Sequence, residues 1–169
     1  MEYLQIFDEN KNMLNEKIER SLKLTLTGNK YCMLIMLFIE NDKGEFLLQK
    51  TSKSRNSEIA TTGGHVTYGD DGFKTTIKEA KEELGVNLLP EDLKYVDTIV
   101  WGNAYIEVYY TNKLINKDEL KLQEEEVESV DWYTIDEINN LIEGDNFRKS
   151  NIEPFKKVLN YKKSLIKNR

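Results

Sequence analysis

The sequence predicts an α+β protein in which helices pack on a mixed β-sheet. Several apolar runs have the length of strands, and other segments carry apolar residues at the spacing of a helix. These segments follow one another without a regular β–α–β alternation, which favours a mixed sheet. The 169 residues suit a single domain with one core.

Composition and charge describe a polar globular protein and exclude some classes of function. The net charge of −6 argues against a general nucleic-acid binder. The single cysteine, Cys32, excludes an internal disulfide, and its apolar neighbours predict a buried thiol. The acidic start of the chain and a longest apolar run of only eight residues, 32–39, indicate neither a signal peptide nor a membrane span. We therefore expect a cytoplasmic protein without a membrane partner.

The N-terminal residues 1–28 are expected to form an extension, and residues 29–169 a single globular domain. Within the extension, residues 3–7 and 13–18 are candidates to pair as a small β element around a polar stretch, residues 8–12.

The main domain is expected to begin with two strands. Residues 31–40 form a continuous apolar run, which predicts a buried strand, and residues 45–50 resume as a second strand after the turn-forming segment Asn-Asp-Lys-Gly. We interpret the two strands as a hairpin. A polar loop, residues 51–58, and a short segment, residues 59–62, then lead to a pair of glycines.

A helix is predicted at about residues 73–84. Apolar side chains recur there at helical spacing, at Phe73, Ile77, Ala80 and Leu84. Gly85 follows at the position where glycine commonly ends a helix.

Strands and two more helices are predicted in the second half of the chain. Residues 95–101 and 105–111 indicate strands around a Gly-Asn turn, and residues 127–133 indicate another strand. Thr134 followed by Glu137 has the pattern of a capping box, which predicts the start of a short helix. Residues 152–167 predict a last amphipathic helix that carries Ile152, Phe155, Leu159 and Ile166.

The side of the first helix opposite its apolar stripe carries three carboxylates. Glu79, Glu82 and Glu83 are spaced i, i+3 and i+4, which places them within one helical turn. Like charges at this spacing repel one another and weaken a helix unless a cation lies among them. Carboxylate oxygens are ligands that Mg²⁺ and Mn²⁺ prefer, so the spacing points to a divalent metal site.

Residues 64–86 resemble the Nudix box, whose pattern is G-x5-E-x7-R-E-U-x-E-E-x-G-U, where U is a bulky apolar residue. The matching positions are Gly64, Asp70, Lys78-Glu79-Ala80, Glu82-Glu83 and Gly85-Val86, with the spacing kept throughout. Flanking segments at residues 46–50 and 125–132 are also similar to elements of the family, so the resemblance spans roughly residues 30–165.

The resemblance implies an α/β/α sandwich that hydrolyses a nucleoside diphosphate linked to another moiety. By resemblance, Glu82 and Glu83 are ligands of Mg²⁺ or Mn²⁺, Glu79 is a ligand or the general base, and the carbonyl of Gly64 completes the metal shell. Lys78 takes the catalytic position that the family gives to arginine. Such a metal neutralises the diphosphate and acidifies a bound water.

Further residues are candidates for the same site. Either Glu125 or Glu126 is a candidate metal ligand or base, because related enzymes often draw an acid from this region. Arg55 and Lys53 are candidates for phosphate contact. The only histidine, His65, is expected to be structural. Three aromatic residues are weighed as base-stacking groups, with packing as the default expectation for each: Tyr68, Trp101 and Tyr105.

Two departures from the pattern concern charge geometry. Asp70 is one methylene shorter than the usual glutamate, and Lys78 offers a point charge where arginine would offer a planar fork. One alternative is therefore a catalytically weak or silent module of the same fold that binds a nucleotide. Another is an isopentenyl-diphosphate isomerase, which the solitary His65 and the distant Cys32 disfavour. The expected partner is a small molecule, and either a monomer or a homodimer is expected.

Overall fold

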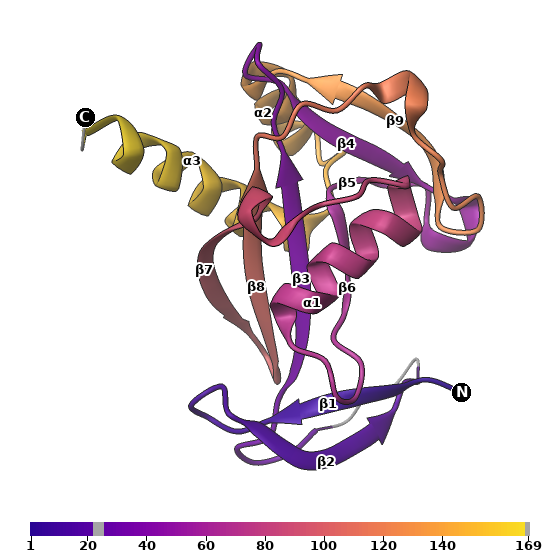
Figure 1. Cartoon of the computed structure of the whole chain (residues 1–169), viewed down its shortest axis with the longest axis vertical. Coiled ribbons are helices and arrows are strands. Elements are labelled where there is room, and N and C mark those ends of the chain that lie inside the picture. Colours follow the sequence, from indigo (N-terminus) through magenta and orange to yellow (C-terminus); the bar gives the residue numbers. More distant parts are fainter. Residues whose placement is uncertain (22–25, 168–169) are drawn as a thin grey trace.

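The computed structural model describes residues 1–21 and 26–167. Residues 22–25, in the expected extension, and residues 168–169, at the end of the expected main domain, lie outside the described residues. Within the described part of the chain, nine strands form three sheets, and three α-helices accompany them. The mixed α+β class predicted from the sequence is confirmed (Figure 1).

The central sheet is mixed, as predicted. Its strands, in spatial order, are β6 (Thr62–His65), β3 (Cys32–Ile39), β8 (Ala104–Thr111) and β7 (Lys94–Trp101). β3 and β8 run parallel, whereas β6 and β7 pair antiparallel with their neighbours. A second sheet contains β5 (Ile59–Ala60), β4 (Phe46–Thr51) and β9 (Val127–Tyr133), and a third pairs β1 (Tyr3–Phe7) with β2 (Met13–Glu19).

The predicted hairpin between residues 31–40 and 45–50 is wrong, although both segments are strands. β3 lies in the central sheet and β4 in the second sheet, and among the described residues an isolated bridge between Glu40 and Phe46 is what joins them. The turn itself forms, since Asn41 Oδ1 accepts hydrogen bonds from the backbone of Lys43 and Glu45. Short-range turn chemistry closes the loop, but β3 pairs with β6 and β8 whereas β4 pairs with β5 and β9, so the two strands lie in different sheets.

The predicted first helix is present, and its last turn is wider than an α-helical turn. α1 (Gly72–Glu79) begins at Asp71, whose carboxylate accepts a hydrogen bond from the backbone N–H of Lys74 at 2.8 Å. The helix continues as one π-helical turn over Ala80–Leu84. Gly85 ends it with φ of +72°, which is the left-handed cap predicted from the sequence.

Helices cover both faces of the central sheet, which is the sandwich that the resemblance implies. Along β3, Ile35 and Leu37 face the layer that contains α1, whereas Met36 and Phe38 face the opposite layer. That opposite layer contains α2 (Ile135–Glu143) and α3 (Ile152–Lys167). The period of two along a strand sends successive side chains to opposite faces, so one strand contributes to both cores.

The predicted helix signals in the C-terminal part are largely confirmed. Thr134 and Glu137 form a reciprocal capping box at the start of α2. In α3, Phe155 and Val158 are buried against the second core. Ile166, which the sequence pattern places on the apolar face, is 69% exposed because α3 extends beyond the sheet there (Figure 1).

The β1–β2 hairpin packs against the main domain through its first strand. Leu4, Ile6 and Phe7 are buried, and the backbone of Phe7 exchanges two hydrogen bonds with Tyr31 at the entrance of β3. Lys11, at the turn of the hairpin, forms an ion pair with Glu107 of β8 at 2.8 Å. Toward the open end, the backbone of Gln5 donates to Val66 and that of Tyr68 donates to Tyr3, which holds this end beside the segment that follows β6. No helix among the described residues has the length and apolar character needed to cross a bilayer.

Candidate functional site

A polar cavity of about 380 Å³ lies at the junction of the two larger sheets, the first helix and the N-terminal hairpin. Its floor consists of β3, β4 and β6. Its walls come from the end of α1 and the following π turn, from residues 123–126, and from residues 148–151. Glu2 and Arg20, at the open end of the β1–β2 hairpin, also line it.

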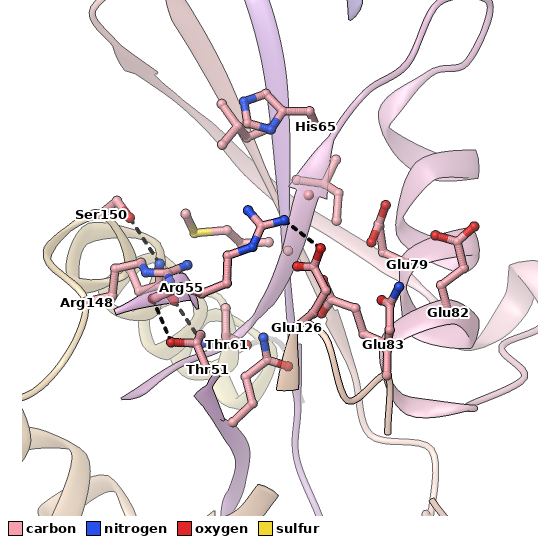
Figure 2. Close-up of a pocket in the computed structure, with 18 of the residues that line it drawn as sticks. Thr51, Arg55, Thr61, His65, Glu79, Glu82, Glu83, Glu126, Arg148 and Ser150 are labelled. Carbon is pink, nitrogen blue, oxygen red and sulfur yellow. Dashed lines mark hydrogen bonds and ion pairs between the residues drawn. The ribbon is translucent and has the colours of Figure 1, made fainter. Parts of the chain in front are cut away.

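One wall of the cavity is acidic. Glu79, at the end of α1, and Glu82 and Glu83, in the π turn, all line it, and Glu126 joins them from the loop before β9. Figure 2 shows Glu79 and Glu82 on the helix side, with Glu126 toward the opposite side. A π turn inserts extra backbone into the helix and is often found at functional sites. Here it lies under two of the three carboxylates of the predicted trio.

The carboxylates of the acidic wall have too little positive charge close by to balance their own. Burial raises the pKa of Glu83 to about 8, and the nearby charges of Glu79 and Glu126 add to the increase. Burial likewise raises the pKa of Glu79 to about 7, with Glu82 contributing and Lys78 opposing. Glu83 is 4% exposed, and its Oε2 atom has no hydrogen-bond partner among the described residues. A buried carboxylate of this kind is stabilised when it binds a proton or a cation.

The close packing of Glu79 on β6 depends on a glycine. A Cβ atom at Gly64 would lie 2.7 Å from Cδ and 2.9 Å from Oε1 of Glu79. The absence of a side chain at Gly64 therefore lets the carboxylate of Glu79 lie directly against the strand. This explains why the box needs glycine at its first position.

The donor chemistry of the acidic wall fits a hard divalent cation such as Mg²⁺ or Mn²⁺. Carboxylate and carbonyl oxygens are the ligands of these ions, and the orphaned Oε2 of Glu83 is a free ligand atom. Within residues 1–21 and 26–167, however, no three His, Cys, Asp or Glu side chains converge closely enough to form a closed ligand set. Three carboxylates could bind one ion directly only if their side chains turned toward a common point.

The wall that faces the carboxylates is basic. Arg55 extends into the cavity and donates a hydrogen bond from Nη2 to Oε1 of Glu126 at 2.6 Å (Figure 2). Arg20 pairs with Glu2 at 2.7 Å, and Arg148 pairs with Glu58 through its Nε. The cavity therefore has the box carboxylates on the helix side and the guanidinium groups on the other side. Each guanidinium group is paired with a glutamate, and two of these, Glu2 and Glu126, also line the cavity.

His65 of β6 lies between these charges and is held neutral. Burial lowers its pKa to about 4, and the positive charges of Arg20 and Arg55 lower it further, whereas Glu2 opposes them. The expectation of a structural role fits its place in the β3–β6 ladder opposite Leu34. His65 nevertheless also lines the cavity.

The structure brings together most of the residues singled out by the sequence. The cavity is lined by six of them, namely Gly64, Arg55, Glu79, Glu82, Glu83 and Glu126. Lys78 lies outside it, in an adjoining hollow beside Tyr68. Lys53 and Glu125 do not line the cavity; the carbonyl of Glu125 accepts a hydrogen bond from Ser52. Asp70 is engaged in a local turn, where its Oδ2 accepts from the hydroxyl of Thr67.

Sequence reasoning missed several lining residues that come from distant segments. Glu2, Arg20, Arg148, Gln49 and Gln123 were not among the predicted site residues. One sequence signal was available for two of them, because arginine is rare in this chain and lysine is common. The others carry no motif, and only the packing of the hairpin and the loops brings them to the site.

The three aromatic residues weighed as base-stacking groups lie outside the cavity. Packing was the default expectation for each of them. Tyr105 is buried and stacks on Tyr31, and its hydroxyl donates to the carbonyl of Asp8. Tyr68 donates to Asn15 of the hairpin, and Trp101 is half exposed beside the turn at Gly102. None of these side chains lines the cavity.

Comparisons with known proteins all point to one family. A family model described as the NUDIX domain matches residues 31–154. An uncharacterized Nudix hydrolase of Listeria innocua is 24% identical over 139 residues, which cover 77% of this chain and 82% of that protein. A second uncharacterized Nudix hydrolase, from Yersinia pestis, is 23% identical and covers 82% of this chain and 76% of the relative.

The fold is shared with solved structures. The crystal structure of DR0079 from Deinococcus radiodurans superposes with a TM-score of 0.72 and covers 89% of this chain and 94% of that one. The two sequences are 17% identical, so this likeness concerns the fold alone.

Proposed function

This chain belongs to the NUDIX family and is a hydrolase that acts on pyrophosphate bonds; from that premise, we propose that it cleaves a nucleoside diphosphate derivative at the acidic wall of the cavity. The observation that carries the proposal is the buried carboxylate of Glu83, which lies beside Glu79 with one oxygen unpartnered among the described residues. A buried charge without a partner is costly, and its retention suits a site that binds a cation.

Members of the family generally use divalent metal ions, and we propose Mg²⁺ or Mn²⁺ for this chain. Glu82, Glu83 and the carbonyl of Gly64 would hold the ion. When bound, the ion would neutralise the diphosphate and lower the pKa of a water molecule. Glu126 is a further candidate ligand from the loop before β9, and it is favoured over Glu125 because Glu126 lines the cavity.

Glu79 is assigned as a ligand or as the base that accepts a proton from the attacking water. Its pKa, raised to about 7, is suited to proton transfer near neutral pH. The two roles differ in what Glu79→Gln changes. Loss of a ligand weakens the affinity for the metal, whereas loss of a base lowers kcat and leaves metal affinity intact.

Arg55 is proposed to contact a substrate phosphate, because its guanidinium points into the cavity (Figure 2). Lys53 is a weaker candidate, since its side chain is outside the cavity lining. Lys78 is proposed to act on Glu79 through its charge, which lowers the pKa of that carboxyl. A point charge holds a carboxylate less firmly than the planar fork of arginine would.

The test is turnover on a panel of nucleotide substrates by the wild type and by Glu82→Gln and Glu83→Gln, with Mg²⁺ and with Mn²⁺. Each substitution should lower kcat/KM by about 10²–10³-fold, because a ligand charge is lost. Glu128→Gln is the matched control, since Glu128 is on β9 and pairs with Lys50 away from the cavity. Wild-type rates in both box variants would refute the assigned roles.

A second candidate function is a module that binds nucleotides without hydrolysing them. It is favoured by one observation, that no closed set of three ligands is formed among the described residues. Tight binding of a nucleotide, with no phosphate or nucleoside monophosphate released in Mn²⁺, would support it. The isomerase alternative has less support, because Cys32 is buried in β3 and does not line the cavity.

A further inference from the structure

Among the described residues, arginine side chains line the cavity and lysine side chains do not. The sequence contains four arginines against twenty lysines. Every arginine that the structure describes lines this one cavity, namely Arg20, Arg55 and Arg148, and none of the described lysines does. A surface that merely needed positive charge would draw on the far more abundant lysine. The distribution therefore points to a role for the guanidinium group itself.

Arginine differs from lysine in the shape of its cationic group. The planar fork presents several N–H donors in fixed directions and matches the oxygens of a phosphate in a two-bond contact. Among the described residues, each of the three guanidinium groups makes its side-chain hydrogen bond through a single nitrogen, to Glu2, Glu126 or Glu58. The remaining donors of each fork are available for an anion.

The three arginines come from separate segments and flank one space. Arg20 follows β2, Arg55 ends the 3-10 turn Lys53–Arg55 after β4, and Arg148 precedes α3. Figure 2 shows Arg55 extending toward Glu126, with Arg148 on the far side from Glu79 and Glu82. A chain of phosphates that starts at the acidic wall would therefore meet further cationic groups along the basic wall.

Among the described residues, the imidazole of His65 is the only aromatic ring that lines the cavity. No Phe, Tyr or Trp in the described part of the chain lines it. Residues 22–25 and 168–169, which the structure does not describe, include no aromatic residue either. The volume of the cavity, about 380 Å³, is near the lower end of the 300–1,000 Å³ common for ligand pockets. With one small ring on its lining, the cavity offers little surface for stacking a base, whereas its guanidinium groups offer donors to a row of phosphates.

We propose that Arg20, Arg55 and Arg148 form a phosphate-binding wall, and that the enzyme selects substrates with three or more consecutive phosphates while discriminating little among nucleobases. This proposal rests on the proposed function, because it assigns the substrate class of the same site. Arg55 binds near the bond that is cleaved, where Glu126 now holds it. Arg20 and Arg148, which line the cavity from the N-terminal hairpin and from the segment before α3, bind the additional phosphate charge.

The first experiment compares substrates that differ in a single feature. Rates are measured for ATP, GTP, CTP and UTP, and for the four matching nucleoside diphosphates. The expected result is a kcat/KM higher for each triphosphate than for its diphosphate by about tenfold or more, as one charge-assisted hydrogen bond supplies. The four triphosphates should differ among themselves by less than about threefold. A strong preference for one base would overturn the proposal.

The second experiment removes the side chains of Arg20 and Arg148. Arg20→Ala and Arg148→Ala should lower kcat/KM for triphosphates by about tenfold or more and for diphosphates by less than about threefold. Arg20→Lys and Arg148→Lys should restore only part of the loss, because charge is kept and the fork is not. The matched controls are Lys17→Ala on the hairpin and Lys149→Ala beside Arg148, and neither should alter the preference. Equal losses on both substrate classes would overturn the proposal.

Direct binding separates failure of this proposal from failure of the proposed function. Calorimetry of the same triphosphates and diphosphates is performed with wild type, Arg20→Ala and Arg148→Ala. If no nucleotide is hydrolysed but triphosphates still bind more tightly and the arginine variants lose that difference, the phosphate-binding wall stands and the hydrolase assignment to nucleotides fails. If nucleotides are hydrolysed but bind without regard to phosphate number, only the wall is refuted.

Discussion

Arg55 and Glu126 join the two walls of the cavity by one hydrogen bond of 2.6 Å, although 71 positions separate them in the chain. Arg55 stands in the loop after β4, and Glu126 in the loop before β9, the strand that pairs with β4. The negative charge of Glu126 also contributes to the raised pKa values of Glu79 and Glu83. One ion pair thus links Arg55, the proposed phosphate-binding residue, to the acidic wall.

This relationship predicts that Arg55→Ala separates stability from activity. Both side chains of the pair are partly exposed, so its loss should change the free energy of unfolding by less than about 1 kcal/mol. Turnover should fall by about tenfold or more, because a charge-assisted contact to phosphate is lost. Urea denaturation and steady-state kinetics measure the two effects. A large loss of stability with unchanged kcat/KM would contradict the assignment.

The pH dependence of stability should reveal the two buried carboxylates whose pKa values are raised. Glu79 and Glu83 have folded-state pKa values of about 7 and about 8, raised from 4.5. At these two groups the folded state binds more protons than the unfolded state between pH 4.5 and 8, which lowers stability as pH rises. His65, whose pKa is lowered from 6.5 to about 4, opposes them at the acidic end, so the decline should be steepest above pH 6.5. Thermal unfolding without metal, measured from pH 5 to pH 8.5, should show this decline.

A divalent metal should reverse that decline, because it replaces the protons as the compensating charge. Mn²⁺ should raise Tm more at pH 8 than at pH 5.5. In Glu83→Gln the decline between pH 5 and pH 8 should shrink, since one of the two titrating groups is gone. A wild-type Tm that rises across this window, or that ignores the metal at pH 8, would contradict the account of the acidic wall.

Gly64→Ala should damage the site more than the fold. The new Cβ would meet the end of the Glu79 side chain, which is flexible and can turn away. We expect a small change in Tm but a loss of turnover of about 10²-fold, because Glu79 is displaced from its position on the strand.

Gly63→Ala is the matched comparison and should show the opposite pattern. Its Cβ would lie 2.7 Å from the backbone oxygen of Ile35, which cannot move without disturbing the central sheet. Unfolding experiments should find Gly63→Ala clearly less stable than Gly64→Ala. Equal stability of the two variants would refute this distinction between neighbouring glycines.

Lys11→Met should loosen the N-terminal hairpin. It leaves Glu107, whose side chain is 11% exposed, without its cation. The free energy of unfolding should fall by about 1–3 kcal/mol, and the double variant Lys11→Met with Glu107→Gln should recover part of it. Because Glu2 and Arg20 stand on this hairpin, preference for triphosphates should also weaken. Urea denaturation and the nucleotide panel measure both effects.

Local signals in the sequence predicted much of the fold. The apolar stripe from Phe73 to Leu84, the cap at Gly85 and the capping box at Thr134 all depend on residues within a few positions of one another. The pairing of β3 and β4 was predicted wrongly, because turn chemistry is local, whereas the partners of each strand are decided by how other segments of the chain pack beside it. The π turn over Ala80–Leu84 was likewise not visible in the hydrophobic pattern.

By itself, the sequence determined the family, the fold class and the grouping of Glu79, Glu82 and Glu83, because local patterns and a motif of fixed spacing carry them. Only the tertiary structure decided what faces that wall. It brought Arg20, Arg55 and Arg148 to one cavity from segments far apart in the chain, and it left Lys53, Lys78 and Glu125 outside. Spacing along a helix fixes which side chains share a face, whereas the partners across a cavity depend on how sheets, hairpin and loops pack together.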